Sequence, residues 1–457
     1  LRKQGLASDH IAADDTHDVP ALRISLCLLS TAMCLQAQAF HQRRPNSYKQ
    51  TAADNAVTEL NQRLQSGGLE LEWEPVRGRL RALLSALGVP ASSQTLVFSK
   101  TSLQRHRISP KNPRALYFND DVYVGWIPGA ASLEVAVGDP KLGLAFYSLP
   151  QDPDKPAQLL RDDTCLSCHA TSRTLDEPGL LLRSVFPDDQ GDPIPSAGES
   201  DMDYRSPIAE RWGGWLVTGK FEGDHRGNGV ATRRDGGGWQ VPPRPAQDLR
   251  AFEDDFDAAR YLEETSDIGA LLALEQQVTV HNLLIRAGHQ MRYLIEKDRV
   301  MQALLQTDRE PPSTASSASE PSESTARIAT TLANQITAAM LLEGEAPLAP
   351  HNVQSDPDFA REYAALWTQP QTKSQLGILD LSEHTFTLRL SPMIHSRAFQ
   401  RLPISLRERV LSRMQVAIER GVPPGDVRMD PATRRTLTLH LRATVPGWPA
   451  PLRHRRR

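Results

Sequence analysis

The sequence predicts an α+β protein, in which a strand-rich N-terminal half is followed by a mainly helical C-terminal half. Between residues 94 and 149, short runs of β-branched and aromatic residues alternate with Pro, Gly, Asn and Asp, a pattern that predicts a small sheet or meander. Apolar residues recur at helical spacing over 267–308, which predicts one long helix. Shorter helices are predicted near 54–66, 75–87, 326–343, 355–367, 404–421 and 429–442. Further strands are predicted near 180–188 and 213–221, and a hairpin or strand near 384–391.

These elements divide the chain into six regions. They are an export signal with an extended lead (1–39), an N-terminal helical segment (40–93), a strand-rich region around Cys165 and Cys168 (94–250), a long helix packing on it (251–310), a Ser/Pro-rich linker (311–325) and a C-terminal helical region (326–457). A hydrophobic content of 39% is enough for a sizeable core, whereas the linker has no large apolar side chain to bury. The net charge of −3 gives no global reason to expect nucleic-acid binding.

The N-terminal region predicts export from the cytoplasm. An apolar run over 24–35 follows Arg23, and Ala37-Gln38-Ala39 provides a small-residue cleavage site. The run is too short to span a bilayer, and a long acid-containing lead precedes it, so we expect the translation start nearer Arg23. We therefore predict a periplasmic or secreted protein that is cleaved after Ala39. No later run approaches the ~18 apolar residues of a membrane span, so none is expected.

The run Cys165-Leu166-Ser167-Cys168-His169 has the spacing that attaches a c-type haem. Two thiols separated by two residues can each bond to one vinyl group of the same porphyrin, and the following imidazole can ligate the iron. Cys27 and Cys34 lie in the predicted export signal, so the mature chain would keep only the two cysteines of this motif. The sequence therefore predicts one covalent haem c, with His169 as the proximal iron ligand.

Three other interpretations of the motif remain. It could be half of a zinc site, which would need two further His or carboxylate ligands. It could be a thioredoxin-like dithiol, although Pro153, Pro156 and Asp162 before it are poor material for the buried strand that such a site follows. It could also have arisen by chance.

A sixth iron ligand is expected from His or Met residues. His281 is predicted on the apolar face of the long helix, and His225 lies in a Gly-rich loop. Met393 and Met202 are further candidates. Each has an ordinary structural alternative, namely a hydrogen-bonded histidine or a methionine that fills a gap in the core.

Arg205, Arg211 and Trp212 are predicted to help bind the cofactor. They lie close together around the sequence RWGGW, and the guanidinium group of Arg suits the carboxylates of haem propionates. The alternative is that these residues only pack in the core and form a surface ion pair.

Several stretches resemble a family of uncharacterised exported bacterial proteins described as cytochrome c domain proteins. They are FSKTSLQ (98–104), NPRALYFNDDVYVGW (112–126), TCLSCH (164–169), RSVFPD (183–188), RSPIAERWGGWLVTG (205–219), HNLLIR (281–286) and SPMIHSRAFQRLP (391–403). The resemblance covers about 95 to 445 and implies haem binding and export. The chain departs from the family pattern at Arg226, where relatives have Met, and at Gln276, where they have His, so neither position can supply those ligands here.

These observations predict an exported monohaem cytochrome that transfers electrons to or from a partner redox protein. The motif lies far into the mature chain with strand-like sequence on both sides, so an ordinary small all-α cytochrome c fold is not expected. The chain is much longer than one haem requires, which favours the alternative of a haem enzyme or a gas or redox sensor with an open sixth position. A third possibility is a haem with a structural role in a large binding protein.

Overall fold

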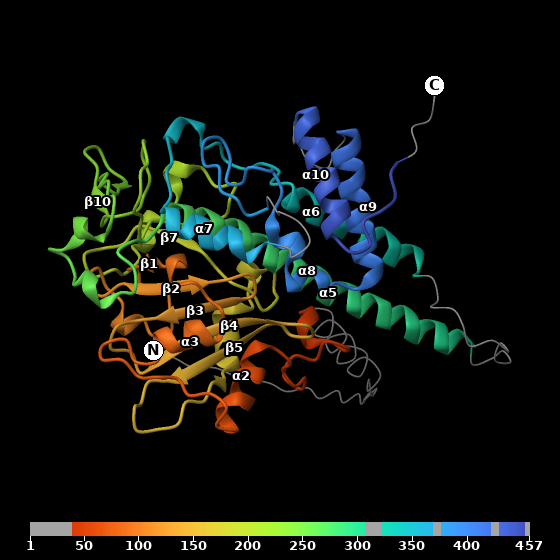
Figure 1. Ribbon diagram of the computed structural model, residues 1–457, viewed down its shortest axis with the longest axis horizontal. Helices are drawn as coiled ribbons and strands as arrows, with labels where there is room; N and C mark the ends of the chain where they lie inside the picture. Colours follow the sequence, from red (N-terminus) through yellow and green to blue (C-terminus); the bar gives the residue numbers. More distant parts are fainter. Residues whose placement is uncertain (1–38, 307–320, 369–375, 422–428, 453–457) are drawn as a thin grey trace, which may run out of the picture. The chain divides into compact units, whose positions relative to one another are not determined.

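The computed structural model describes residues 39–306, 321–368, 376–421 and 429–452. The predicted export signal, apart from its last residue, and residues 311–320 of the predicted linker lie outside these ranges. Within them, the chain from Phe40 onwards forms one compact unit. The architecture is α+β, as predicted, with a seven-stranded sheet in the N-terminal half and helices in the C-terminal half (Figure 1).

The main sheet is an antiparallel meander with one added edge strand. Its strand order is β6-β5-β4-β3-β2-β1-β9, so the first six strands pair with their neighbours in sequence. The strands are β1 (Thr95–Val97), β2 (Arg114–Phe118), β3 (Val122–Trp126), β4 (Ser132–Asp139), β5 (Gly143–Pro150), β6 (Leu160–Arg161) and β9 (Trp215–Leu216). Two small hairpins pair β7 (Arg183–Val185) with β8 (Glu199–Asp201) and β10 (Thr232–Arg233) with β11 (Trp239–Gln240). The meander predicted over 94–149 is confirmed.

The predicted helices are found near their predicted positions. The helices are α2 (Ala56–Gln65), α3 (Leu80–Ala86), α4 (Leu166–His169), α5 (Ile268–Gln306), α6 (Glu323–Met340), α7 (Pro357–Leu366), α8 (Arg397–Gln400), α9 (Ile404–Arg420) and α10 (Pro431–Thr444). However, α3 begins five residues later than predicted, and the short helices α4 and α8 were not predicted. Local signals explain several starts. Asn55 and Thr58 form a capping box on α2, and Pro is the first residue of α7 and of α10.

The sheet separates two hydrophobic cores. Side chains on one face of the meander, such as Tyr117, Val124 and Val135, pack with α2 and α3. The opposite face, which includes Phe118 and Phe146, belongs to the larger core formed with α5 and the C-terminal helices. The period-two alternation of strands creates this division, because successive side chains point to opposite faces of the sheet.

Helix α5 is the central helix of the larger core. Its start is capped by Asp267, whose Oδ2 accepts a hydrogen bond from the Ala270 N–H at 2.9 Å. By length and composition Ile268–Leu305 could cross a membrane, and no other helix of the described residues could. However, 89% of its most apolar window is buried inside the protein, as in the core helix of a soluble domain. The structure is therefore compatible with the expectation that the chain has no membrane span.

Two predicted boundaries need correction. Residues 384–391 were predicted to form a hairpin or a strand; they contain no strand, and the pairing there is limited to one antiparallel bridge between Leu379 and Phe386, with bends around it. The predicted linker ends earlier than residue 325, because Ser322 caps α6 by accepting a hydrogen bond from the Thr325 N–H at 3.2 Å. A Ser followed by good helix formers can start a helix. This start was not predicted because Ser322 lies within a Ser-rich run that was assigned to the linker by its composition.

Candidate functional site

The cysteine motif forms a single helical turn beside the edge of the main sheet. It follows β6, and Asp162 starts the turn by accepting a hydrogen bond from the Thr164 N–H at 3.0 Å. Cys165 and His169 are four residues apart, so they lie on the same side of the turn. Both face a pocket, with Cys165 half-buried and Cys168 exposed.

This pocket, called the motif pocket below, lies between the sheet, α5 and the segment that follows the motif. It is a cavity of about 200 Å³ that opens to solvent. Leu274 and Val278 of α5 form one wall, and 180–182 form another. Most of the lining is apolar, so the pocket suits a mainly hydrophobic ligand.

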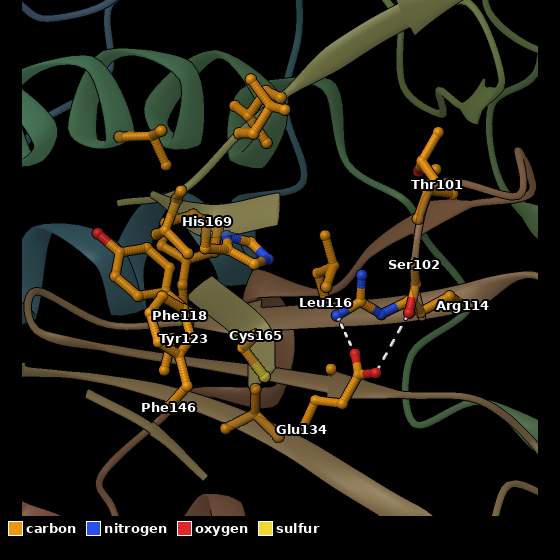
Figure 2. A pocket seen from close by; sticks show the side chains of 18 of the residues that line it. Thr101, Ser102, Arg114, Leu116, Phe118, Tyr123, Glu134, Phe146, Cys165 and His169 are labelled. Atoms are coloured by element: carbon orange, nitrogen blue, oxygen red, sulfur yellow. Dashed lines mark hydrogen bonds and ion pairs between the residues drawn. The ribbon is translucent and has the colours of Figure 1, made fainter. Parts of the chain in front are cut away.

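The register of the sheet builds the floor of the motif pocket. Phe118 pairs with Tyr123, Tyr123 with Ala136, and Ala136 with Phe146, so these four residues form a row across β2, β3, β4 and β5. All four line the pocket, and Figure 2 shows the three aromatic rings grouped on one side of it. A row fixed by backbone pairing is a rigid surface on which to place a ligand.

His169 is held in an orientation suited to metal ligation. Its Nδ1 lies 2.8 Å from the Gly179 carbonyl oxygen, so Nδ1–H donates and the lone pair on Nε2 stays available. The imidazole packs on Phe146 at 4.9 Å between ring centroids and points into the pocket (Figure 2). Burial lowers the pKa of His169, although the bond to Gly179 opposes this shift, so the ring is neutral near pH 7.

Cys165 does not resemble a reactive dithiol cysteine. Burial raises the pKa of its thiol to about 12, whereas catalytic dithiols have thiol pKa values below the usual range. Among the described residues, no group of three or more His, Cys, Asp and Glu side chains could hold a metal ion. The motif therefore has no third and fourth protein ligands for a tetrahedral zinc site within that part of the chain.

One end of the motif pocket carries charge. Arg114 forms an ion pair with Glu134, which also accepts hydrogen bonds from Ser102 at 3.2 Å and Gln104 at 3.0 Å (Figure 2). Burial acts to raise the pKa of Glu134, but Arg114 and these hydrogen bonds hold it below its usual value. The carboxylate is therefore ionised.

Two features position the basic side chains of the pocket. Gly125 lies between Leu116 and Glu134 across the strands, and its missing side chain leaves the path that the Arg114 guanidinium takes to Glu134. Arg183 also lines the pocket, and it is paired with Glu199 of β8. The site thus has two guanidinium groups along a mainly apolar cavity.

The structure places His281 outside the motif pocket. It is fully buried on α5, and its Nδ1 lies 3.0 Å from the hydroxyl of Tyr123, whose ring belongs to the pocket floor. It lines a separate small cavity with Arg401 and Ile285. Burial lowers the pKa of His281 to about 4, as for a neutral core histidine.

The other predicted sixth ligands do not line the motif pocket either. His225 packs edge-on against Trp212, at 5.4 Å between ring centroids, and borders another cavity; burial lowers its pKa to about 4. Met393 is fully buried in the larger core. Met202 accepts a hydrogen bond from the Trp212 N–H at 3.1 Å. No His or Met other than His169 is among the described residues that line the motif pocket.

The residues around RWGGW form a buried charge cluster instead of lining the motif pocket. Arg211 pairs with Glu275 at 2.6 Å, and the Trp212 indole N–H donates to the same carboxylate at 2.7 Å. Arg205 is exposed and pairs with Asp203. Of this stretch, only Trp215 reaches the pocket. Arg205, Arg211 and Trp212 are therefore placed apart from the motif.

Sequence reasoning missed Arg114, Glu134 and Arg183. The first two stand at the start of RALYF and in the middle of SLEVAV, where period-two alternation places them on the same face as the aromatic floor. That alternation was the available signal, but it becomes useful only when the strand register is known.

The chain matches no protein-family model, no curated protein and no solved structure.

Proposed function

We propose that this chain is an exported protein that binds one haem c covalently through Cys165 and Cys168, with His169 as the proximal iron ligand. The observation that carries the proposal is that Cys165, Cys168 and His169 line one mainly apolar pocket, in which the His169 tautomer leaves Nε2 free to ligate. Bound haem would supply an iron that exchanges one electron or binds a small ligand. The resemblance to exported cytochrome c domain proteins points the same way.

The residues of the pocket fit this cofactor. The row of Phe118, Tyr123 and Phe146 offers a flat apolar surface for a porphyrin and excludes water from it. Arg114 and Arg183 would donate hydrogen bonds to the two propionates, although each guanidinium also pairs with a glutamate, Glu134 and Glu199 respectively. The Gly179 carbonyl keeps the proton on Nδ1 of His169 and makes Nε2 a stronger donor.

The iron would have an open sixth position, which favours a haem enzyme or a gas or redox sensor. The supporting observation is that the described residues lining the pocket include no second His or Met, while the four candidates from the sequence lie elsewhere. A side of the iron without a protein ligand can take a small molecule. Arg114 and Glu134, which line the same pocket, would then be charged side chains available to interact with such a molecule.

Electron transfer with a partner redox protein is the second candidate. It is favoured by the exposure of Cys168, because a thioether at the surface would bring the edge of the porphyrin close to solvent and to a docked protein. A carrier of this kind would need a sixth ligand that the pocket lining does not supply, or would work with five.

Absorption spectra of the protein, matured in a host with c-type haem assembly, test both the covalent attachment of haem and the open sixth position. We expect haem that stays on the polypeptide in denaturing gels and is lost in Cys165→Ser/Cys168→Ser, together with a high-spin ferric spectrum and fast CO binding after reduction. Haem that acid acetone extracts would refute covalent attachment.

The two candidate functions predict different absorption spectra for variants of the candidate iron ligands. With an open position, His169→Ala changes the absorption spectrum by removing the imidazole ligand, whereas His281→Ala and His225→Ala leave the spectrum unchanged. A six-coordinate, low-spin spectrum in both oxidation states that turns high-spin in either of the last two variants would replace the enzyme or sensor function with electron transfer.

A further inference from the structure

The carboxylate of Glu177 binds the start of the folded chain. Its Oε1 accepts a hydrogen bond from the backbone N–H of Phe40 at 2.9 Å, and its Oε2 accepts one from the N–H of His41 at 3.0 Å. His289 of α5 adds a third contact, with Nδ1 2.7 Å from Oε2. Glu177 is 1% exposed, so the carboxylate holds the first residues of the compact unit from inside the protein.

Among the described residues, no Arg or Lys side chain forms an ion pair with this buried carboxylate, although the nearby guanidinium of Arg292 interacts with it electrostatically. Burial acts to raise the pKa of Glu177, but the hydrogen bonds from His289 and His41 hold it below its usual value, so the group is ionised. Within the described residues its ion pairs are to these two histidines. Burial lowers the pKa of His289, against the opposing effect of Glu177, and Nε2 of the same ring lies 3.0 Å from the Lys141 carbonyl oxygen. A buried charge is expensive unless a charge of opposite sign is paired with it.

The predicted cleavage site and the start of the compact unit both fall at the residue that this carboxylate contacts. The sequence Ala37-Gln38-Ala39 predicts cleavage after Ala39, which makes Phe40 the first residue of the mature protein. The compact unit also begins at Phe40. The atom that cleavage would convert from a peptide nitrogen into an amino group is therefore the atom that already bonds to Glu177.

We propose that removal of the export signal creates an ammonium group on Phe40 that forms a buried ion pair with Glu177. A signal peptidase adds water across the Ala39–Phe40 peptide bond; Ala39 keeps the new carboxylate, and the released amine of Phe40 takes up a proton. Glu177 is thus a binding site for the amino terminus that processing creates. The proposal rests on the proposed export of the protein.

The ion pair is coupled to the orientation of His169. Glu177 belongs to the loop that returns from the motif, and its backbone bonds to Thr174 in both directions, at 3.2 Å and 2.9 Å. Two residues later, Gly179 closes the loop on His169: its N–H donates to the His169 carbonyl at 2.8 Å, and its own carbonyl accepts from Nδ1. Cleavage after Ala39 would therefore stabilise the loop from Glu177 to Gly179, and this loop keeps the proton of His169 on Nδ1 so that Nε2 can ligate.

The first test measures the amino terminus of the protein purified after export. Intact mass should identify Phe40 as the first residue. Acetic anhydride near pH 7 labels free α-amino groups, whose usual pKa is about 8, and it should label the folded protein at least tenfold more slowly than the urea-unfolded protein. A different first residue, or equal labelling rates, would overturn the proposal.

Two variants separate the charge from the hydrogen bonds. Glu177→Gln keeps the size of the side chain but removes its charge and one of its two acceptor oxygens, and it should speed the labelling several-fold; Glu72→Gln, at an exposed carboxylate, should leave it unchanged. Insertion of one Ser between Ala39 and Phe40 keeps the Phe40 N–H while moving the ammonium away by one residue. It should lower the thermal midpoint in the wild-type background, and Glu177→Gln should then lower the midpoint less than it does without the insertion.

The outcomes distinguish this proposal from the proposed function. Haem staining of the same samples reports covalent haem independently of the amino terminus. Protein that starts at Phe40 with a protected amine but carries no haem would keep the ion pair and refute haem binding. Haem-loaded protein in which the Ser insertion has no effect on the midpoint would refute the ion pair alone.

Discussion

Replacement of Gly125 by Ala tests how the charged end of the motif pocket is built. A methyl group at this position would lie 2.9 Å from Nε of Arg114 and closer still to Nη2, so the guanidinium must leave its place. The backbone of Gly125 does not have a positive φ, so Ala introduces no strain of its own. Gly125→Ala should therefore act mainly by separating Arg114 from Glu134.

The expected loss follows from the nature of this ion pair. A hydrogen bond to a charged group contributes about 1.5–3 kcal/mol. The two side chains are 19% and 28% exposed, so solvent screening reduces the expected loss in the free energy of unfolding to about 1–2 kcal/mol. Urea titration followed by tryptophan fluorescence measures it. Gly68→Ala, which meets nothing closer than 3.4 Å, is the matched control and should change the free energy by less than about 0.5 kcal/mol.

A double-mutant cycle with Glu134→Gln decides whether the reasoning is right. If Ala at position 125 acts by breaking the ion pair, its effect should shrink by about 1 kcal/mol once Glu134 is neutral. Additive effects, within about 0.5 kcal/mol, would show that the two sites are independent and would refute the role assigned to Gly125. The same outcome would weaken the assignment of Arg114 as a propionate partner that Glu134 holds in place.

Three further predictions concern α5. Burial raises the pKa of Glu275 from 4.5 to about 7, against the opposing effects of Arg211 and Trp212. The folded state therefore binds one more proton than the unfolded state between these pH values, and the free energy of unfolding should fall as the pH rises through that window. Glu275→Gln should remove this slope in urea titrations from pH 4 to 8. Arg211→Met leaves the carboxylate without its cation and should cost about 3–5 kcal/mol at pH 8 and less at pH 5; equal losses at both would contradict the pairing. Asp267→Ala removes the cap of α5 and should cost about 1–2 kcal/mol by the same titration, whereas Asp267→Asn should recover most of this loss.

The sequence was informative where the signal is local. Period-two alternation and turn residues placed the meander over 94–149, and helical spacing placed α5 within two residues at each end. The cysteine motif was equally visible, because its chemistry depends on a spacing of four residues. In each case the interactions that decide the structure lie within a few residues along the chain.

The partners of side chains were not predictable in the same way. Arg211 and Trp212 looked suited to a cofactor, yet their partner is Glu275, 64 and 63 residues further along the chain. Sequence spacing carries no information about such a contact. Conversely, Arg114 and Glu134 meet because Gly125 lies between them across three strands, and only the register of the sheet reveals this. Pairs of residues that are far apart in the sequence could therefore be identified only from the structure.

The length of the chain beyond the motif has a structural explanation in the way α5 is supported. One face of α5 supplies Leu274 and Val278 to the motif pocket, while α6 packs against α5 and α9 packs in turn against α6. A single helix facing a cavity would be poorly held, because tertiary packing supplies most helical stability. The C-terminal helices thus make one wall of the pocket rigid, and the meander makes the other. A cavity with two rigid walls can keep its shape without a ligand bracing it on both sides, which is compatible with the proposed haem and its proposed open sixth position.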